Sequence, residues 1–305
     1  RVTAGVNNAK TRAEGAGTPL KNPLSLTVVN KNENATLAKK YTYVNKVFTK
    51  DDNGAWNCSE TLLWQKDTQP VDIVAFAPAP NGKFNGVYAE GSTQPIQSIT
   101  YSVSDDQSTP SDNNDLLYYY AKDFKPGTSL VDKKLSIQFN HAFCMIDIVV
   151  TLGTEFNKPN VLKESPIVKV TLGGTKIAAN VNVTNAASVV TASEEAAATD
   201  ITTTKGSFTP AENADKKADP EKNAISRFSC IAIPQTVAGK TFKVSLMTAG
   251  KLYEWTSDKE ITLQSGYRYT LNLSMGNDVV LLKGGSISAS PWTEGDTGDK
   301  PLETD

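Results

Sequence analysis

Apolar and polar residues alternate along most of this chain, in runs bounded by glycine, proline, asparagine and aspartate. Helical periodicity is nearly absent. Such alternation predicts β-strands with one buried and one solvated face. The clearest run lies at residues 267–275, where odd positions are apolar and even positions are mostly polar. The pattern therefore predicts an all-β fold built from β-sandwich layers.

Residues 135–152 change their pattern half way. The apolar positions are odd up to residue 139, and even from residue 142 onward; they are Leu135, Ile137, Phe139, Ala142, Cys144, Ile146, Ile148 and Val150. Side chains alternate across a strand, so the switch indicates a bulge, a bend or passage between two sheets. We interpret this segment as a core strand that closes the first of two domains.

Two hairpins are recognisable from their turns. Residues 41–48 lead into the turn sequence DDNG and return at residues 55–58. Residues 241–256 reverse at the sequence TAGK between two alternating runs. Glycine and polar residues between alternating runs are typical of β-hairpins, and we expect one at each place.

The length of 305 residues predicts two domains, at about 150 residues for each. We place them at residues 1–155 and 156–305. Residues 1–22 are expected to be a flexible leader, and residues 293–305 a flexible tail. Residues 184–223 are rich in Ala, Thr, Glu and Lys without a sustained period, so we predict a long exposed insertion there, with one helical turn near residues 193–198.

Composition narrows the function classes. The net charge of −2 gives no attraction to nucleic acid. Four arginines stand against many lysines, which weighs against an anion-processing site. Of the three cysteines, Cys144 and Cys230 lie in apolar strand patterns, and buried free thiols are favoured over a disulfide. The polar start of the chain has the character of a trimmed mature sequence rather than a signal peptide.

Catalytic chemistry has few candidates. His141 is the only histidine, and Cys144, three residues on, would point to the opposite face of a strand. We expect His141 to bind backbone at the pattern switch. Residues 105–115 offer carboxylate and amide oxygens for a cation, but the EF-hand order is missing and a solvated loop is favoured. Tyr118, Tyr119 and Tyr120 are consecutive, so one should face solvent. We predict no enzyme activity and no cofactor.

Several segments resemble, in order, the fimbrillin family of surface proteins from Bacteroides-type bacteria. The segments are WQKDTQPVDIVAFAP, DNNDLLYYYAK, FNHAFCMIDIVVTL, CIAIPQT, GYRYTLNLSM and SASPWTEG, and they span residues 60–295. His141, Pro234, Gly266 and Tyr269 are the positions that match the family pattern. Phe143, Cys144 and Met145 replace the usual small residue and lysine of that strand.

The resemblance implies two transthyretin-like (Ig-like Greek-key) β-sandwich domains in tandem. It also implies an exported lipoprotein, held at the outer membrane by a lipid anchor outside this chain and displayed on the cell surface as a fimbrial subunit. Such subunits mature by an Arg-specific cut near the N-terminus, for which Arg12 is the candidate; an ordinary solvated arginine is the equally favoured alternative. The cut frees a groove that is filled by a strand from another fimbrial subunit.

The candidate strand-exchange segment is apolar and close to the C-terminus. Either it is donated to a neighbour or it packs on its own chain; its residues are Val279, Val280, Leu281, Leu282, Ile287 and Trp292. An alternative function is a surface adhesin or carbohydrate-binding module, a tip or anchor subunit that does not polymerise. Its ligand would be a host glycan or protein, bound by loops such as residues 105–115 and 184–223.

Overall fold

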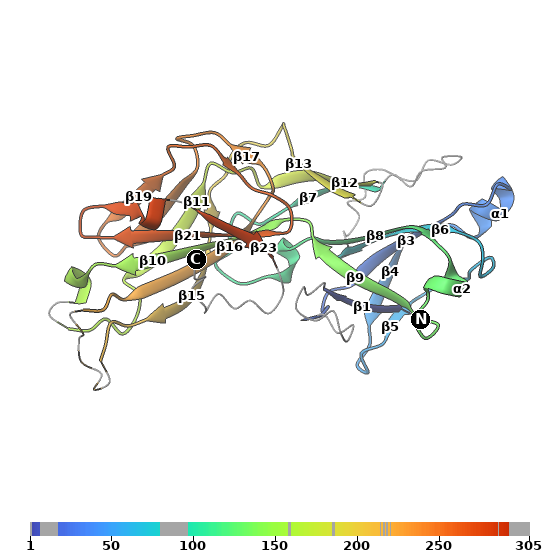
Figure 1. Cartoon of the computed structure of the whole chain (residues 1–305), viewed down its shortest axis with the longest axis horizontal. Coiled ribbons are helices and arrows are strands. Elements are labelled where there is room, and N and C mark those ends of the chain that lie inside the picture. Colours follow the sequence, from blue (N-terminus) through green and yellow to red (C-terminus); the bar gives the residue numbers. More distant parts are fainter. Residues whose placement is uncertain are drawn as a thin grey trace.

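The computed structural model describes residues 2–6, 18–79, 97–157, 160–184, 187–213, 215, 217, 219, 221–285 and 287–292. Strands dominate these residues, and the two α-helices are short: α1 (Ala35–Lys40) and α2 (Pro126–Ser129) (Figure 1). The all-β prediction is confirmed. No helix in the described ranges is long and apolar enough to cross a membrane.

The first sheet contains eight strands and curls on itself. In spatial order they are β2 (Thr18–Pro19), β1 (Val2–Val6), β9 (Leu135–His141), β8 (Leu117–Phe124), β6 (Val71–Ala77), β3 (Leu24–Asn30), β4 (Tyr43–Lys50) and β5 (Trp56–Cys58). Only β1 and β9 run parallel within this described sheet. The curl brings β1 into contact with β5. The hairpin predicted around the DDNG turn is confirmed as β4–β5.

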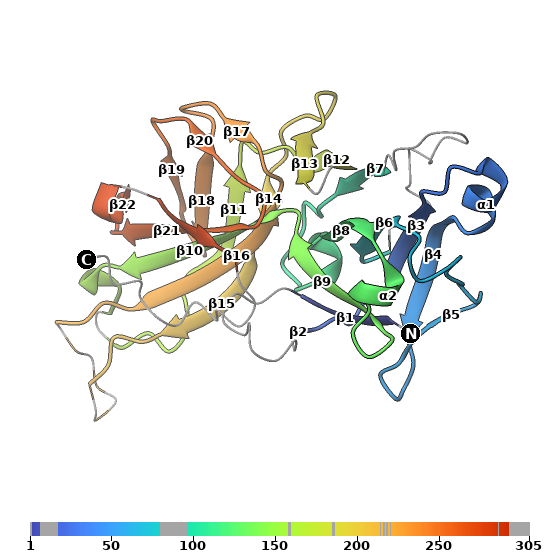
Figure 2. The same ribbon diagram turned by 45° about the vertical axis from the view of Figure 1, so that its right-hand side comes forward.

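Two further sheets pack face to face at the other end of the molecule (Figure 2). The larger is formed by β15 (Thr204–Thr209), β16 (Ile225–Ala232), β10 (Cys144–Leu152), β21 (Tyr267–Met275), β22 (Val280–Leu282) and β23 (Ser288–Pro291). The smaller is formed by β14 (Ile201–Thr202), β11 (Ile167–Gly173), β18 (Lys243–Thr248) and β19 (Leu252–Thr256). The predicted hairpin at residues 241–256 is confirmed as β18–β19.

Short elements complete the described fold. β13 (Ala187–Ala192), β12 (Ala178–Thr184) and β7 (Gln97–Ser102) form one small sheet, and β17 (Thr236–Val237) pairs with β20 (Ile261–Thr262). The 3₁₀ turns are η1 (Asp112–Asn114), η2 (Thr154–Asn157) and η3 (Lys283–Gly285).

The pattern switch in residues 135–152 is passage between two sheets. β9 buries its odd positions in the eight-stranded sheet, and β10 buries its even positions in the six-stranded sheet. β10 lies between β16, which is antiparallel to it, and β21, which is parallel. On its partly exposed row, Asp147 forms an ion pair with Arg268 of β21. The chain therefore changes sheets at residues 142–143, where both side chains are buried.

Two apolar clusters meet across β6 and β8. Ile73 and Ala75 belong to the cluster inside the curled sheet, whereas Val74 and Phe76 belong to the larger cluster between the other two sheets. β8 behaves alike: Tyr119 packs on the first cluster, while Tyr118 and Tyr120 pack on the second. All three tyrosines keep partial exposure, and the expectation that one of them faces solvent stays a prediction. The domain division after residue 155 stays a prediction.

Residues 184–223 contain more structure than the sequence pattern predicts. β13, β14 and β15 lie in this segment, and the side chains of Ile201 and Ala211 are fully buried. The expected helical turn at residues 193–198 is absent, and turn and coil take its place. The short, threonine-rich strands have too few apolar positions to reveal a period, and pairing with β11, β12 and β16 decides their conformation.

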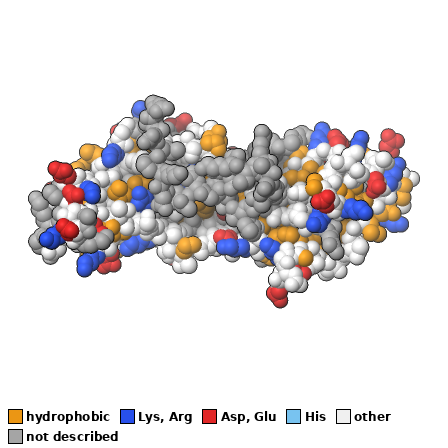
Figure 3. All heavy atoms as spheres, turned by 60° about the horizontal axis from the view of Figure 1, so that its bottom comes forward, with side chains coloured by type: hydrophobic (Ala, Val, Ile, Leu, Met, Phe, Trp, Pro, Cys, Tyr) orange, Lys and Arg blue, Asp and Glu red, His pale blue; other side chains and the backbone are white. Residues whose placement is uncertain are grey.

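Charged side chains of both signs are interspersed on the face seen in Figure 3, with apolar residues scattered between them. This face carries no large patch of a single sign outside the grey atoms. The distribution agrees with the net charge of −2.

Candidate functional site

The N-terminal strand β1 is held on the edge of β9. Val2 to Val6 pair in parallel with Leu135 to Phe139, and β2 pairs with the far side of β1 through Gly5 and Val6. Val6 is buried, Val2 and Ala4 pack partly buried on the first cluster, and Thr3 faces solvent. Alternate side chains of β1 thus complete the apolar core while its backbone completes the sheet.

The connection between β1 and β2 lies outside the described residues, and so does the candidate processing residue Arg12. This connection is the covalent link between β1 and the rest of the chain. Without β1, the backbone of β9 from Leu135 to Phe139 would lose a ladder partner. An edge of this kind is a template for another strand.

The C-terminal candidate segment packs on its own chain in this structure. β22 pairs with the end of β21 at Leu273 to Met275, and β23 pairs with its beginning at Tyr267 to Thr270. Val280 and Trp292 are buried, whereas Val279 and Leu281 are 50% and 58% exposed. Leu282 and Ile287 pack partly buried against the second cluster. Whether the segment is donated to another subunit is not tested by this arrangement.

His141 lies where several distant segments meet. Its Nδ1 is 2.8 Å from an Asp115 carboxylate oxygen, and its ring stacks on Trp292 with centroids 3.6 Å apart and planes 10° from parallel. The Ser265 hydroxyl donates to the carbonyl oxygens of His141 and Ala142. The expectation that the His141 side chain binds backbone is therefore corrected. The imidazole contacts the Asp115 carboxylate and the Trp292 indole, and the main-chain carbonyl of His141 accepts the hydrogen bond from Ser265.

The other family-pattern positions surround this point. Gly266 donates its N–H to the Phe143 carbonyl and accepts from the Trp292 N–H. The Tyr269 hydroxyl donates to the Thr262 carbonyl and accepts from the Gln264 N–H. Burial is the main cause that raises the pKa of Tyr269. A tyrosine hydroxyl that binds backbone a few residues upstream fixes a β-sandwich corner in this way.

Pro234 is buried at the same corner. The next residue, Gln235, exchanges backbone hydrogen bonds with Leu263, which lies between the two residues whose backbone Tyr269 binds. His141, Gly266, Tyr269 and Pro234 therefore brace the joint between strands. The sequence pointed to these four positions but missed Asp115, which only the fold brings to His141.

The loop at residues 105–115 uses its oxygens for its own backbone. The Asn114 side chain accepts from the Ser104 N–H, and Asp106 accepts from the Ser108 N–H. A hydrogen bond with the Ser108 side chain is the main cause that lowers the pKa of Asp106, and the hydrogen bond from the Ser108 N–H adds to it. Among the described residues, no group of three or more His, Cys, Asp or Glu side chains could hold a metal ion.

The cysteines are free thiols, as predicted. Cys144 and Cys230 are buried, and burial raises the pKa of both thiols. The Cys144 thiol donates to the Ala232 carbonyl at 3.1 Å. A raised pKa keeps the reactive thiolate scarce, so both behave as small apolar side chains.

Comparison with known proteins adds the family. The model of the fimbrillin-like family matches residues 11–292. This chain belongs to the fimbrillin-like family. No curated protein matches it at a significant level.

Solved structures share the fimbrillin-like fold over nearly the whole chain. A proposed cell adhesion protein from Bacteroides ovatus has a TM-score of 0.61 at 18% identity, over 95% of this chain and 96% of the other. A second proposed cell adhesion protein, from Bacteroides uniformis, has a TM-score of 0.58 at 16% identity, over 90% of this chain and 93% of the other. A fimbrial protein from Bacteroides vulgatus has a TM-score of 0.56 at 16% identity, over 96% of this chain and 99% of the other. At such identities the likeness concerns the fold.

Proposed function

We propose that this protein is a non-enzymatic structural subunit of cell-surface fimbriae, which joins other fimbrial subunits by strand exchange after a cut at Arg12. Family membership supports the fimbrial role. The observation that carries the exchange is β1, a short strand that completes both the ladder and the core of β9. Anchoring at the outer membrane through a lipid outside this chain, and adhesion to a host ligand, belong to the same proposal.

The loss of β1 from β9 is unfavourable unless another strand takes its place. When β1 leaves, the N–H and C=O groups of β9 lose their partners, and the core loses the side chains of Val2, Ala4 and Val6. An incoming strand with apolar residues at alternate positions restores both terms. The donor that we propose is the segment from Val279 to Trp292, which must first leave β21. β22 buries fewer side chains than a long strand, so it is the easier part to detach.

An Arg-specific protease tests this proposal. The chain has four arginines, of which Arg227 lies within β16 and Arg268 within β21. Strand pairing protects these two in the folded protein, and a cut at Arg1 removes one residue only. We therefore expect selective cleavage after Arg12, followed by growth in mass by light scattering and filaments by electron microscopy.

Arg12→Lys is the matched control, because it keeps the charge and removes the protease site. The treated Arg12→Lys protein should remain monomeric. Cleaved wild-type protein that stays monomeric at every concentration, alone and mixed with intact protein, would contradict strand exchange and favour a tip or anchor subunit.

A further inference from the structure

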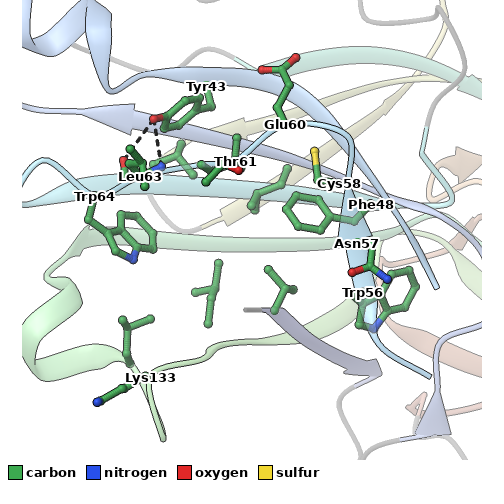
Figure 4. A pocket seen from close by; sticks show the side chains of 16 residues that line it. Tyr43, Phe48, Trp56, Asn57, Cys58, Glu60, Thr61, Leu63, Trp64 and Lys133 are labelled. Carbon is green, nitrogen blue, oxygen red and sulfur yellow. Dashed lines mark hydrogen bonds between the residues drawn. The ribbon is translucent and has the colours of Figure 1, made fainter. Parts of the chain in front are cut away.

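A cavity of about 250 Å³ opens inside the curled eight-stranded sheet (Figure 4). Val2 of β1 and Leu135 of β9 line one side of it, and these two residues are partners in the parallel ladder. Strands β3, β4 and β5 and residues 60–64 supply most of the other walls. The cavity therefore borders the first residue of β1, where this strand docks on the edge of β9.

The deep wall of the cavity is apolar. Five of the lining side chains are buried, and all five are aliphatic or aromatic: Leu26, Val28, Phe48, Trp56 and Leu135. Four polar lining residues are instead exposed, and they form the rim: Asn57, Glu60, Thr61 and Lys133. A side chain that reaches past the rim meets apolar atoms, so burial there favours an apolar group.

Two polar groups at the cavity are already bound. The Glu60 carboxylate points away from the other lining side chains and pairs with Lys46 Nζ at 2.6 Å. The Tyr43 hydroxyl donates to the Leu63 carbonyl at 3.2 Å and accepts from the Leu63 N–H at 3.0 Å. An apolar side chain can therefore enter without taking a hydrogen-bond partner from either group.

The side chains that β1 places on this core are small. Its inward row consists of Val2, Ala4 and Val6, of which Val6 is buried and the other two are partly buried. Val2 is the member of this row that borders the cavity. Unfilled space beside a small side chain leaves the surrounding apolar atoms without contacts, and this lowers stability. A valine at this position thus packs the edge of β9 less well than a larger apolar residue would.

We propose that this cavity is a side-chain pocket for an incoming strand, and that it receives a large apolar side chain at the place that Val2 now holds. The inference rests on the proposed strand exchange, and the strand belongs to another fimbrial subunit. Such a strand forms the same ladder with β9 and adds contacts in the pocket. Exchange is then favourable because the new strand packs better than β1, and donor strands are selected by the side chain that they bring opposite Leu135.

Substitutions at Val2 test the pocket in the intact chain, where no cut is needed. Val2→Phe and the smaller Val2→Leu should each slow hydrogen exchange in residues 135–139 several-fold, because they fill the space and hold β1 in place. Thr3→Phe, which puts the same ring on the solvent face, is the matched control and should not slow it. The pocket would be wrong if both Val2 variants exchanged as fast as the wild type, or if Thr3→Phe slowed exchange equally.

Peptide competition tests the choice of donor. Protein cut after Arg12 is mixed with synthetic peptides of residues 1–12 that carry the native sequence, Val2→Phe or Thr3→Phe, and native mass spectrometry measures which peptide displaces β1. We expect the Val2→Phe peptide to act at about tenfold lower concentration than the other two. Equal potency of all three would overturn the pocket. Cut protein that takes up no peptide would contradict the exchange itself, so the two failures are distinguishable.

Discussion

His141 shows how one residue can join distant segments. His141 is the last residue of β9, two residues after Phe139, where the pairing with β1 ends. It contacts Asp115 in the loop before β8 and stacks on Trp292 after β23. A single histidine in a sequence suggests catalysis or a pH switch. Here its side chain is 3% exposed and lies between a carboxylate and an indole, so the geometry gives it a structural role at the joint.

The contact between Asp115 and His141 predicts a specific loss of stability. Asp115→Asn removes the charged acceptor 2.8 Å from the imidazole, so we expect the free energy of unfolding to fall by about 1 to 3 kcal/mol in chemical denaturation. Asp112→Asn, an exposed acid in the same loop, should change it by less than about 0.5 kcal/mol. Equal effects of the two substitutions would contradict the structural role of the pair.

Among the elements, β1 is short but contributes to both the sheet and the apolar core. It has five residues, yet it supplies the parallel partner of β9 and buries Val6 in the first cluster.

Substitutions on the two faces of β1 separate docking from simple surface change. Val6→Asp places a carboxylate in the first cluster, where Val6 is 5% exposed, and burial of an unpaired charge should release the strand. Hydrogen exchange in residues 135–139 should then become faster. Thr3→Asp, on the solvent face of the same strand, should leave that exchange unchanged. Slow exchange in both variants would mean that β9 does not depend on β1.

The elements also differ in how readable they are from sequence. The β18–β19 hairpin and β21 have long alternating rows and clear turns, and both were predictable. β14 and β15 were not, because a two-residue strand and a partly exposed strand carry no period. Their partners β11 and β16, distant in sequence, determine them.

For the whole molecule, the alkaline limit of stability follows from buried tyrosine. The Tyr101 hydroxyl donates to the Asn113 carbonyl at 2.6 Å, and burial, with a smaller effect of Asp115, raises the pKa of Tyr101 to about 12. Above pH ~10 the unfolded chain loses this proton while the folded chain keeps it. The folded state then binds more protons, so stability must fall as pH rises.

We expect Tyr101 to contribute a fall of at most about 1.4 kcal/mol per pH unit between about pH 10 and pH 12. Tyr101→Phe should cost about 1 kcal/mol at neutral pH through the lost hydrogen bond, and its stability should fall less steeply in alkali. Denaturation curves of both proteins across this range measure the difference. Buried thiols and other tyrosines affect both proteins alike, so parallel curves would show that Tyr101 does not carry the effect.

Local alternation and turn chemistry determined the all-β class, the two hairpins and the presence of a break in residues 135–152, because these depend on neighbours in the chain. That the break is a change of sheet was decided by the fold. The ordered motif segments also indicated the family. Only the tertiary structure decided that β1 runs parallel to β9 and that Asp115 and Trp292 meet His141. Each of these joins segments far apart in sequence, and no local pattern records which distant surfaces will pack together.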